Sequence, residues 1–475
     1  MEYDVVIGLE THIELNTKSK VFCGCINEFG GEPNTHCCPV CIGLPGALPM
    51  VNAEAIKKAI IMGIVTNCEI TKKFGFDRKH YFYPDTPKSY QITQDRTPIC
   101  TNGYLEVSDN NGNSKKVRIH QIHLEDDAGK LIHSNSGETF VDFNRCGVPL
   151  IEIVSEPDMS SVEEAIEYVT TLKELAKFSG VSDVKMEQGS LRCDVNVSLK
   201  PAGSKEYGIK VEMKNINSFK AIERAIKYEI ARQKLILQKG EKIIQETRRW
   251  DDSLGESFPM RSKEGAKDYR YMPEPDILPI EITETEIEEI KKTIPMLPKE
   301  IKAKLIEQYG LGEYDANLIS KEGEISKFFF DATRHYSNSK KVANWITSEI
   351  NKRINNEFME EVKVLINAKE FAVMLSMLDA GELSQQGART VLNELWGNEE
   401  TTAQIVDRLQ LKMQNNDDEL EELIAKIISE NEKCVQDYKN GNAKAFAFFV
   451  GQVMKATKGQ ANANKVNEFL KKHLS

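Results

Sequence analysis

Apolar and polar residues alternate along much of the first 215 residues, a pattern typical of β-strands with one buried face. The alternation is clearest at residues 191–199, LRCDVNVSL, and at residues 209–213, where apolar side chains share one face and polar side chains the other. Such strands are typical of a sheet that packs on one side and meets solvent or ligand on the other. The first part of the chain is therefore expected to contain a sheet with an open face.

Two helices are predicted to interrupt these strands, at residues 160–180 and 218–240. In the first, Ser160 and Ser161 are each followed three residues later by a glutamate, and either pair fits a capping box. Both ranges end at a glycine, which is a common stop for a helix.

Beyond a cluster of prolines between residues 273 and 298 the pattern becomes helical almost throughout. The prolines indicate a domain boundary near residues 290–298, and polar sequence near residues 393–402 indicates a second. The chain is therefore predicted to have three domains, at residues 1–293, 294–400 and 401–475.

The composition is that of a globular protein, with 40% hydrophobic and 28% charged residues in a chain of 475. No apolar run approaches the roughly 18 residues that span a bilayer, and the acidic start does not resemble a secretory signal. A cytoplasmic location without a membrane partner is expected. Thiols stay reduced there, so clustered cysteines favour metal binding over disulfides.

The net charge of −11 repels phosphates, so a nucleic-acid partner would need a local basic surface. The last 45 residues offer one, although a solvated helix face is the alternative and an acidic stretch lies nearby. The lysines of this region are Lys433, Lys439, Lys444, Lys455, Lys458, Lys465, Lys471 and Lys472.

Half of the ten cysteines lie between residues 21 and 41. Cys23 and Cys25 form one short pair, and Cys38 and Cys41 form a second pair twelve residues later. This spacing predicts a zinc site in which four thiolates fill the tetrahedron, so its role would be structural. Reduced core cysteines are the alternative, and Cys37 is a competing ligand.

Polar strand positions also carry a set of acids and histidines. Period-two spacing puts Glu10 and His12 on one face of a strand, and His123 and Glu125 on one face of another. A third strand presents Glu152. Each strand alone is consistent with a solvated face, but together the acids predict a divalent-cation site of the magnesium or manganese type.

Other catalytic signatures are absent from the sequence. It contains no Walker P-loop, no kinase glycine loop, no G-x-S-x-G elbow and no H-E-x-x-H helix. No cysteine can be paired with an activating histidine from the sequence, so no glutaminase nucleophile is assigned.

Residues 141–158, VDFNRCGVPLIEIVSEPD, resemble the signature of the B subunits of the aspartyl/glutamyl-tRNA amidotransferases, D-x-N-R-x-G-x-P-L-x-E followed by S-x-P. Further similar blocks are GLETHIELNTKSKVFCGC, CPVCIGLPGALPMVN, KHYFYPDTPKSYQITQ, EQGSLRCDVNVS, VEMKNINSF, QETRRWD and MRSKEGAKDYRYMPEPDILP. The resemblance runs along the whole chain and is densest up to about residue 280. The residues that match every fixed position are Asp142, Asn144, Arg145, Gly147, Pro149, Leu150, Glu152, Ser155 and Pro157.

The resemblance implies an α+β fold: a cradle-shaped first domain on an antiparallel sheet with a zinc knuckle, then an all-α domain and a small helical tail that binds tRNA. It also implies that the chain uses ATP to phosphorylate the side-chain carboxylate of Glu-tRNA(Gln), Asp-tRNA(Asn) or both. Ammonia from an amidase (glutaminase) partner, the A subunit, would then displace phosphate, and a small C subunit would complete the complex.

The resemblance also implies roles for individual residues. The expected catalytic and Mg²⁺-binding residues are Glu10, His12, Glu125 and Glu152. Those expected to contact ATP or substrate are Lys79, Lys88, Ser190, Arg192 and Asp194, although solvent exposure is the alternative for the two lysines. Those expected to hold structural Zn²⁺ are Cys23, Cys25, Cys38 and Cys41. Arg145 is expected to be structural.

Two other functions remain open from the sequence. One is a zinc-containing tRNA adaptor that presents a substrate while chemistry occurs elsewhere. The other is a stand-alone ATP-dependent ligase that uses free ammonia. Grouped carboxylates and imidazole distinguish the enzymes from the adaptor, because an adaptor does not need them to converge.

Overall fold

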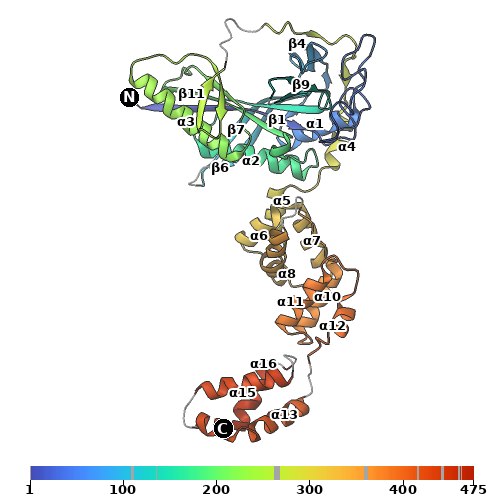
Figure 1. Cartoon of the computed structure of the whole chain (residues 1–475), viewed down its shortest axis with the longest axis vertical. Helices are drawn as coiled ribbons and strands as arrows, with labels where there is room; N and C mark the ends of the chain where they lie inside the picture. The colour runs from blue at the N-terminus through green and yellow to red at the C-terminus, as the bar shows by residue number, and fades with distance from the viewer. Residues whose placement is uncertain are drawn as a thin grey trace. The chain divides into compact units, whose positions relative to one another are not determined.

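The structure is a computed structural model that describes residues 2–474, except residues 109–111, 135, 261–267, 358–361, 414–416, 440–442, 458–460 and 462. The chain separates into two compact units, residues 1–297 and 298–475 (Figure 1). The further boundary near residue 400 stays a prediction.

The first unit is built on a nine-stranded sheet. In spatial order the strands are β14 (Glu256–Pro259), β13 (Thr247–Asp251), β12 (Val211–Lys214), β11 (Leu191–Pro201), β1 (Tyr3–Glu14), β10 (Pro149–Ser155), β7 (Ser114–Asp126), β6 (Cys100–Ser108) and β2 (Glu69–Ile70). Neighbouring strands of this sheet are antiparallel except β12 and β13, which are parallel. The fold is therefore mixed α/β with a large, mainly antiparallel sheet.

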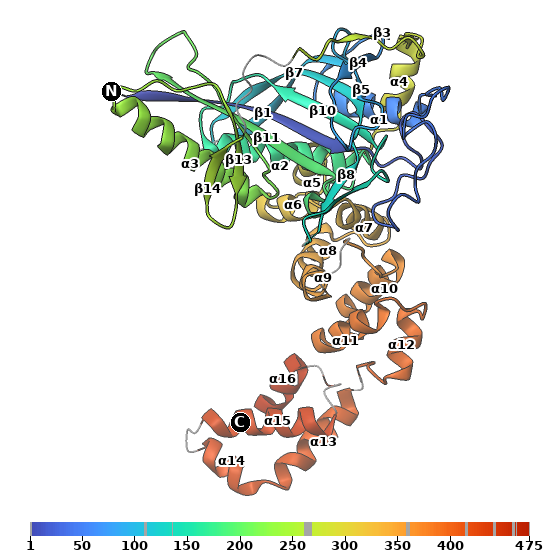
Figure 2. The same cartoon turned by 45° about the horizontal axis from the view of Figure 1, so that its top comes forward.

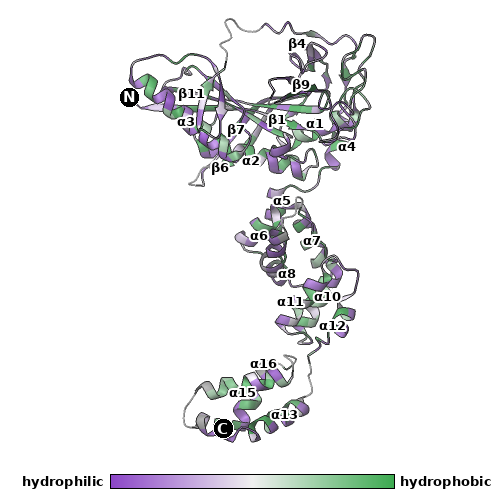
Figure 3. Cartoon of the chain, viewed as in Figure 1, coloured by the Kyte–Doolittle hydropathy of each residue, from purple (hydrophilic) through white to green (hydrophobic). Residues whose placement is uncertain are grey.

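Three helices, α1 (Ala53–Val65), α2 (Val162–Phe178) and α3 (Phe219–Gln238), pack on one face of this sheet (Figures 1 and 2). The apolar residues of the central strands, such as Ile13 and Ile151, are fully buried against them. Both hydrophobic and hydrophilic residues occur along these helices (Figure 3). This mixture is expected of amphipathic helices, which bury one face and expose the other. The polar residues of the same strands therefore face the opposite side.

The predicted helix near residue 160 begins at Ser161, whose hydroxyl accepts from the backbone N–H of Glu164 at 3.1 Å. The reciprocal half of a capping box is missing. The Glu164 carboxylate instead accepts from the backbone N–H of Ser160 at 2.8 Å. Both serines thus contribute to this helix start, but neither forms the complete motif.

Smaller sheets complete the first unit. A three-stranded sheet contains β15 (Met272–Pro273), β4 (Asp77–His80) and β5 (Tyr90–Thr93). Two two-stranded sheets pair β16 (Ile280–Glu281) with β3 (Lys73–Phe74), and β8 (Lys130–His133) with β9 (Thr139–Asp142). Helix α4 (Glu284–Lys292) follows. Strand β5 contacts β7, which brings the three-stranded sheet beside the large one.

A buried ion pair joins Glu274, the residue after β15, to Arg78 on β4. Glu274, 3% exposed, accepts two hydrogen bonds from Arg78, at 2.8 and 2.9 Å. We expect Glu274→Ala to lower the free energy of unfolding by about 2–3 kcal/mol, because it leaves a largely buried guanidinium short of its main partner. Urea unfolding of the full chain measures the change.

The matched control is Glu281→Ala, which removes an exposed pair with Lys73 in the neighbouring β16–β3 sheet. That change should cost clearly less than the loss of the buried pair, because exposed ion pairs contribute little to stability. Equal losses in the two variants would contradict a structural role for the buried pair.

Among the described residues of the second unit, helices are the only regular secondary structure. These are α5 (Pro298–Glu307), α6 (Glu313–Ser320), α7 (Gly323–Thr333), α8 (Ser339–Trp345), α9 (Asn351–Glu357), α10 (Ala368–Asp379), α11 (Gln385–Leu395), α12 (Thr402–Arg408), α13 (Asp417–Ser429), α14 (Glu432–Lys439), α15 (Ala443–Ala456) and α16 (Ala463–Leu474). A π-helical turn, Ile346–Ile350, joins α8 to α9. Residues of α13, α15 and α16 share a core that includes Ile424, Phe449 and Leu470.

None of the described helices is both long enough and apolar enough to cross a bilayer.

Candidate functional site

Four neighbouring strands of the large sheet, β11, β1, β10 and β7, bring polar side chains together on the face away from the helices. His12 on β1 lies opposite Glu152 on β10 and opposite Arg192 on β11. Glu152 in turn lies opposite His123 on β7. Since side chains alternate along a strand, these residues and Glu125, two positions beyond His123, point to the same side.

His12, Glu125 and Glu152 form a compact group. One ligand atom from each lies within 4.8 Å of the others. His12 Nε2 is 3.4 Å from Glu152 Oε2 and 4.0 Å from Glu125 Oε1. Glu125 is only 3% exposed, so its charge has little access to water. One imidazole and two carboxylates facing one point are a donor set that suits a hard divalent cation.

A second imidazole, His123, lies between the two carboxylates. Its Nε2 is 3.1 Å from Glu152 Oε2 and 3.2 Å from Glu125 Oε2. The sequence pattern placed His123 on the same face as Glu125, but no role was predicted for it. The contact between His123 and Glu152 depends on the pairing of β7 with β10. The alternation of apolar and polar residues in the sequence does not indicate which strands pair.

The electrostatics of the group reflect burial together with these contacts. Burial alone would raise the pKa of Glu125 and Glu152, but hydrogen bonds and the charges of His123 and His12 bring both pKa values below their usual range. Burial opposes protonation of the two histidines, yet the carboxylates raise the pKa of both rings. The group therefore holds ionised carboxylates in a nearly water-free position.

Glu10 belongs to a second acidic group, with Asp194 and Glu212 on the neighbouring strands β11 and β12. Lys214 lies 2.5 Å from Asp194 and 2.9 Å from Glu212. Burial and the charge of Glu152 raise the pKa of Glu10. The lysine already balances part of this group's charge, so it is less suited to a cation than the His12 group.

Arg192 extends the polar face on the other side of His12. Its guanidinium contacts Asp127 at 2.5 Å and lies 3.9 Å from Glu14. Burial would raise the pKa of Asp127, but Arg192 and Arg145 lower it. Burial and the charge of Asp127 raise the pKa of Glu14 to about 8. Arg192 is one-third exposed and so remains accessible to an anion.

Ser190, expected to contact ATP or substrate, and Arg145, expected to be structural, both bond to neighbouring protein groups. The hydroxyl of Ser190 donates to Asp183 at 2.8 Å and accepts from the backbone N–H of Lys185 at 2.7 Å, which ties down the turn before β11. Arg145 donates to the carbonyl oxygens of Ala128 and Gly129, at 2.9 and 2.7 Å.

The two lysines expected at the site lie in different surroundings. Lys79 on β4 stands over the ring of Tyr269, 5.1 Å from its centre. Burial would lower the pKa of Lys79, but the negative charges of Glu125 and Glu152, among others, raise it above its usual value.

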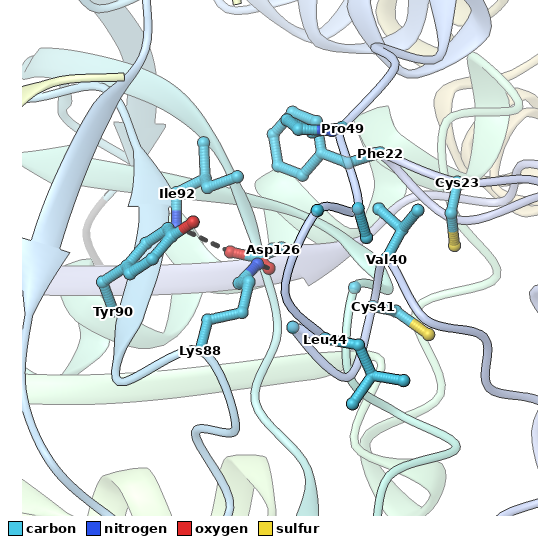
Figure 4. A pocket seen from close by; sticks show the side chains of 14 residues that line it. Phe22, Cys23, Val40, Cys41, Leu44, Pro49, Lys88, Tyr90, Ile92 and Asp126 are labelled. Carbon is cyan, nitrogen blue, oxygen red and sulfur yellow. Dashed lines mark hydrogen bonds and ion pairs between the residues drawn. The ribbon is translucent and has the colours of Figure 1, made fainter. Parts of the chain in front are cut away.

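Lys88 instead pairs with Asp126, which alternation puts on the opposite side of β7 from Glu125. The pair lines a cavity of about 200 Å³ whose other wall is the loop that carries Val40 and Leu44 (Figure 4). In the same view Asp126 is fixed to the backbone N–H of Ile92, at 2.8 Å.

The four predicted zinc ligands converge. Sulfur atoms of Cys23, Cys25, Cys38 and Cys41 all lie within 4.8 Å of one another. The fifth thiol, Cys37, contacts the carbonyl oxygen of Asn34 at 3.2 Å and is outside this group. Four sulfurs around one point are the donor set of a structural zinc site.

A fully buried lysine adjoins this cluster. Lys20 donates to the carbonyl oxygen of His36 at 2.6 Å, and its ammonium lies 3.7 Å from Cys41 Sγ. A hydrogen bond from Cys23 and the positive charge of Lys20 contribute to a Cys41 pKa lowered to about 5. Cys41 is therefore the thiol of the cluster that favours the thiolate, the form that binds metal, whereas the hydrogen bond to Cys41 and burial raise the pKa of Cys23, and burial and neighbouring thiols raise that of Cys25.

The structure describes only some of the lysines in the basic region near the chain end. Lys458 and the side chains of Lys439 and Lys444 lie outside the described residues. Lys472 contacts Glu421 of α13 at 2.7 Å, and the ring of His473 contacts the same carboxylate at 2.9 Å. The assignment of this surface to tRNA stays a prediction.

Comparison with known proteins covers nearly the whole chain. Residues 5–288 match the family model described as the GatB/GatE catalytic domain, and residues 327–474 match the model described as the GatB domain. The first match contains all the residues of the His12 group, the second acidic group and the cysteine cluster.

Curated relatives match over the full length. The chain is 50% identical over 475 residues to the aspartyl/glutamyl-tRNA(Asn/Gln) amidotransferase B subunit of Thermoanaerobacter sp. (strain X514), with all of both chains covered. It is 48% identical over 478 residues to the protein of the same name from Caldicellulosiruptor saccharolyticus, covering 100% of this chain and 99% of the relative. It is 47% identical over 475 residues to that of Clostridium novyi, again with full coverage. The chain therefore belongs to the family of the B subunits of the aspartyl/glutamyl-tRNA(Asn/Gln) amidotransferases.

Proposed function

We propose that this chain activates the side-chain carboxylate of Glu-tRNA(Gln), Asp-tRNA(Asn) or both with ATP, and then joins the activated acyl group to ammonia. The observation that carries the proposal is the convergence of His12, Glu125 and Glu152 in one buried group on the open face of the sheet. Its family membership and the names of its relatives support the same reaction.

The chemistry explains why phosphorylation comes first. A carboxylate is a poor acyl donor, because its leaving group would be oxide. Transfer of the γ-phosphoryl group to a carboxylate oxygen gives an acyl phosphate and ADP. The nitrogen lone pair of ammonia then attacks the acyl carbon, a C–N bond forms, the C–O bond to phosphate breaks, and a proton leaves the nitrogen. Phosphoryl transfer depends on positioning and charge neutralisation more than on a protein nucleophile.

The residues of the site suit these requirements. His12, Glu125 and Glu152 would hold Mg²⁺, which when bound neutralises charge on the phosphates. Glu10 lies in the adjacent acidic group and would contribute to that field, directly or through water. Lys79 would approach a phosphate or the acyl group, and Arg192 a phosphate or the substrate carboxylate. Asp194 would orient Lys214 beside them.

The cysteine cluster is proposed as a structural Zn²⁺ site. All four tetrahedral positions would be filled by protein, which leaves no position for water or substrate. Because the cluster has no open coordination position, we assign it to stability and not to the reaction.

The proposed partners are an amidase, the A subunit, that frees ammonia from glutamine, a small C subunit, and the mischarged tRNA. Three of the six cysteines outside the cluster, Cys100, Cys146 and Cys193, are almost completely buried and so are poorly placed to attack free glutamine. Because the amidase partner is proposed to supply the ammonia, we expect the isolated chain not to release ammonia from glutamine, as a coupled glutamate dehydrogenase assay would measure.

The direct test is reconstitution. The full chain, co-purified with candidate A and C subunits, should convert both mischarged tRNAs, or one of them, to the amide only when ATP and an amide donor are present. Binding of tRNA without any ATP cleavage in the complete complex would overturn the proposal and favour the adaptor. Full conversion by this chain alone with ammonium chloride would instead favour a stand-alone ligase.

A further inference from the structure

His123 is a buried side chain to which neither the resemblance nor the comparisons assign a role. It is 7% exposed, and its Nε2 lies 3.2 Å from Glu125 Oε2 and 3.1 Å from Glu152 Oε2. Both neighbours are carboxylate oxygens, which can only accept when ionised. The nitrogen between them must therefore carry the hydrogen and donate it.

The far side of the ring is held as well. His123 Nδ1 is 3.3 Å from the side-chain amide nitrogen, Nε2, of Gln121, two positions earlier on the same strand. Contacts at both nitrogens fix the plane of the imidazole. The ring cannot turn toward solvent without breaking contacts at both ends.

The hydrogen bonds to Glu125 and Glu152 determine which of their carboxylate oxygens face His12 and are available to a cation. Glu125 uses Oε2 to accept from His123 and from the hydroxyl of Thr93, the latter at 3.0 Å. Its other oxygen, Oε1, is the atom 4.0 Å from His12 Nε2. Glu152 Oε2 lies between the two rings, 3.1 Å from His123 and 3.4 Å from His12.

We infer that His123 is a positioning residue for the cation site: by donating to Glu125 and Glu152 together, it turns their carboxylates toward His12 so that the three ligands meet at one point. Two carboxylates this close repel each other, and without a donor between them they would move apart. The inference rests on the proposed Mg²⁺ site, and it adds a supporting residue that does not itself bind the metal.

The test uses Mn²⁺ alone as the probe on the purified full chain, because bound Mn²⁺ can be counted by electron paramagnetic resonance without nucleotide or tRNA. Removing a side chain that orients a metal ligand typically weakens metal affinity about 10- to 100-fold. We expect His123→Leu to show a loss of this size. His123→Gln keeps an N–H donor near the position of Nε2, so it should recover most of the affinity.

The matched control is His120→Gln on the same strand. His120 is exposed and pairs with Glu156 at 3.0 Å, outside the His12 group. This variant should bind Mn²⁺ like the original chain. Thermal unfolding of all the variants shows whether each is folded at the temperature of the titration.

Pulsed electron paramagnetic resonance separates positioning from direct ligation. Mn²⁺ bound to the original chain and to His123→Gln should show one directly bound nitrogen, whereas any Mn²⁺ that His12→Ala still binds at high metal concentration should show none. Two bound nitrogens would overturn the inference, because His123 would then be a ligand. Equal losses of Mn²⁺ affinity in His123→Leu and His123→Gln would also overturn it. That result would mean that the site requires the shape of the imidazole ring and not its N–H donor.

Two further outcomes are distinguishable. If His12→Ala binds Mn²⁺ as tightly as the original chain, the proposed cation site itself is wrong. If His12→Ala loses binding while folded His123→Leu retains it in full, the cation site stands and only the role of His123 is wrong.

Discussion

Glu125→Gln is expected to reduce ATP cleavage stimulated by mischarged tRNA by about a hundred- to a thousand-fold, with tRNA binding unchanged. Glutamine keeps the size of the side chain but removes one of the two negative charges that face His12. It also replaces an oxygen that accepts from Thr93 and His123. The measurement is phosphate release by the complete complex, together with tRNA affinity by filter binding.

The control for this change is Glu256→Gln, on the exposed start of β14 in the same sheet. It removes the same charge from a strand that does not border the His12 group, so ATP cleavage should stay at the original rate. Normal ATP cleavage in Glu125→Gln would contradict a catalytic role for the group. A parallel loss of tRNA binding would point to a disturbed fold instead of a missing ligand.

Cys38→Ser is expected to have the largest effect on stability. Loss of one thiolate should release structural zinc, and metal binding at such sites contributes directly to the free energy of folding. We expect the melting temperature to fall by at least about 5 °C. The measurements are calorimetry of the full chain and zinc content by atomic absorption.

The neighbouring thiol provides the control. Cys37→Ser alters the adjacent residue, but Cys37 lies outside the group of four sulfurs, so zinc content and melting temperature should stay the same. Exhaustive chelation of the original chain should reproduce the Cys38→Ser result. If zinc is lost and activity disappears while the melting temperature is unchanged, the metal is catalytic and the structural assignment fails.

Much of the local structure was readable from the sequence. The alternation at residues 191–199 lies within β11, and the helices predicted at residues 160–180 and 218–240 are α2 and α3. Local patterns succeed here because one face of each element must be buried. The local pattern did not distinguish Ser160 from Ser161 as the N-cap, because the two candidates differ only in which hydroxyl reaches the helix N-terminus.

The sequence pattern did not predict which site residues lie next to one another in the fold. Alternation indicates which side chains share a face of one strand, but not which strands are neighbours or in what register. Glu10 meets Asp194 because β1 pairs with β11, while His12 meets Glu152 because β1 also pairs with β10. Lys88 and Lys79 look equivalent in sequence, yet Lys88 pairs with Asp126 while Lys79 stands over the ring of Tyr269. Long-range pairing decides each of these cases.

The central position of β1 has a consequence for synthesis on the ribosome. This strand is synthesised before its hydrogen-bonding partners, which are β10, ending at residue 155, and β11, ending at residue 201. At translation rates of about 5–20 residues per second, β1 waits roughly 10–40 s for both. During that interval the nascent chain exposes the apolar face of β1 and two unpaired edges, so chaperones that bind nascent chains would have their main period of contact before residue 201 leaves the ribosome.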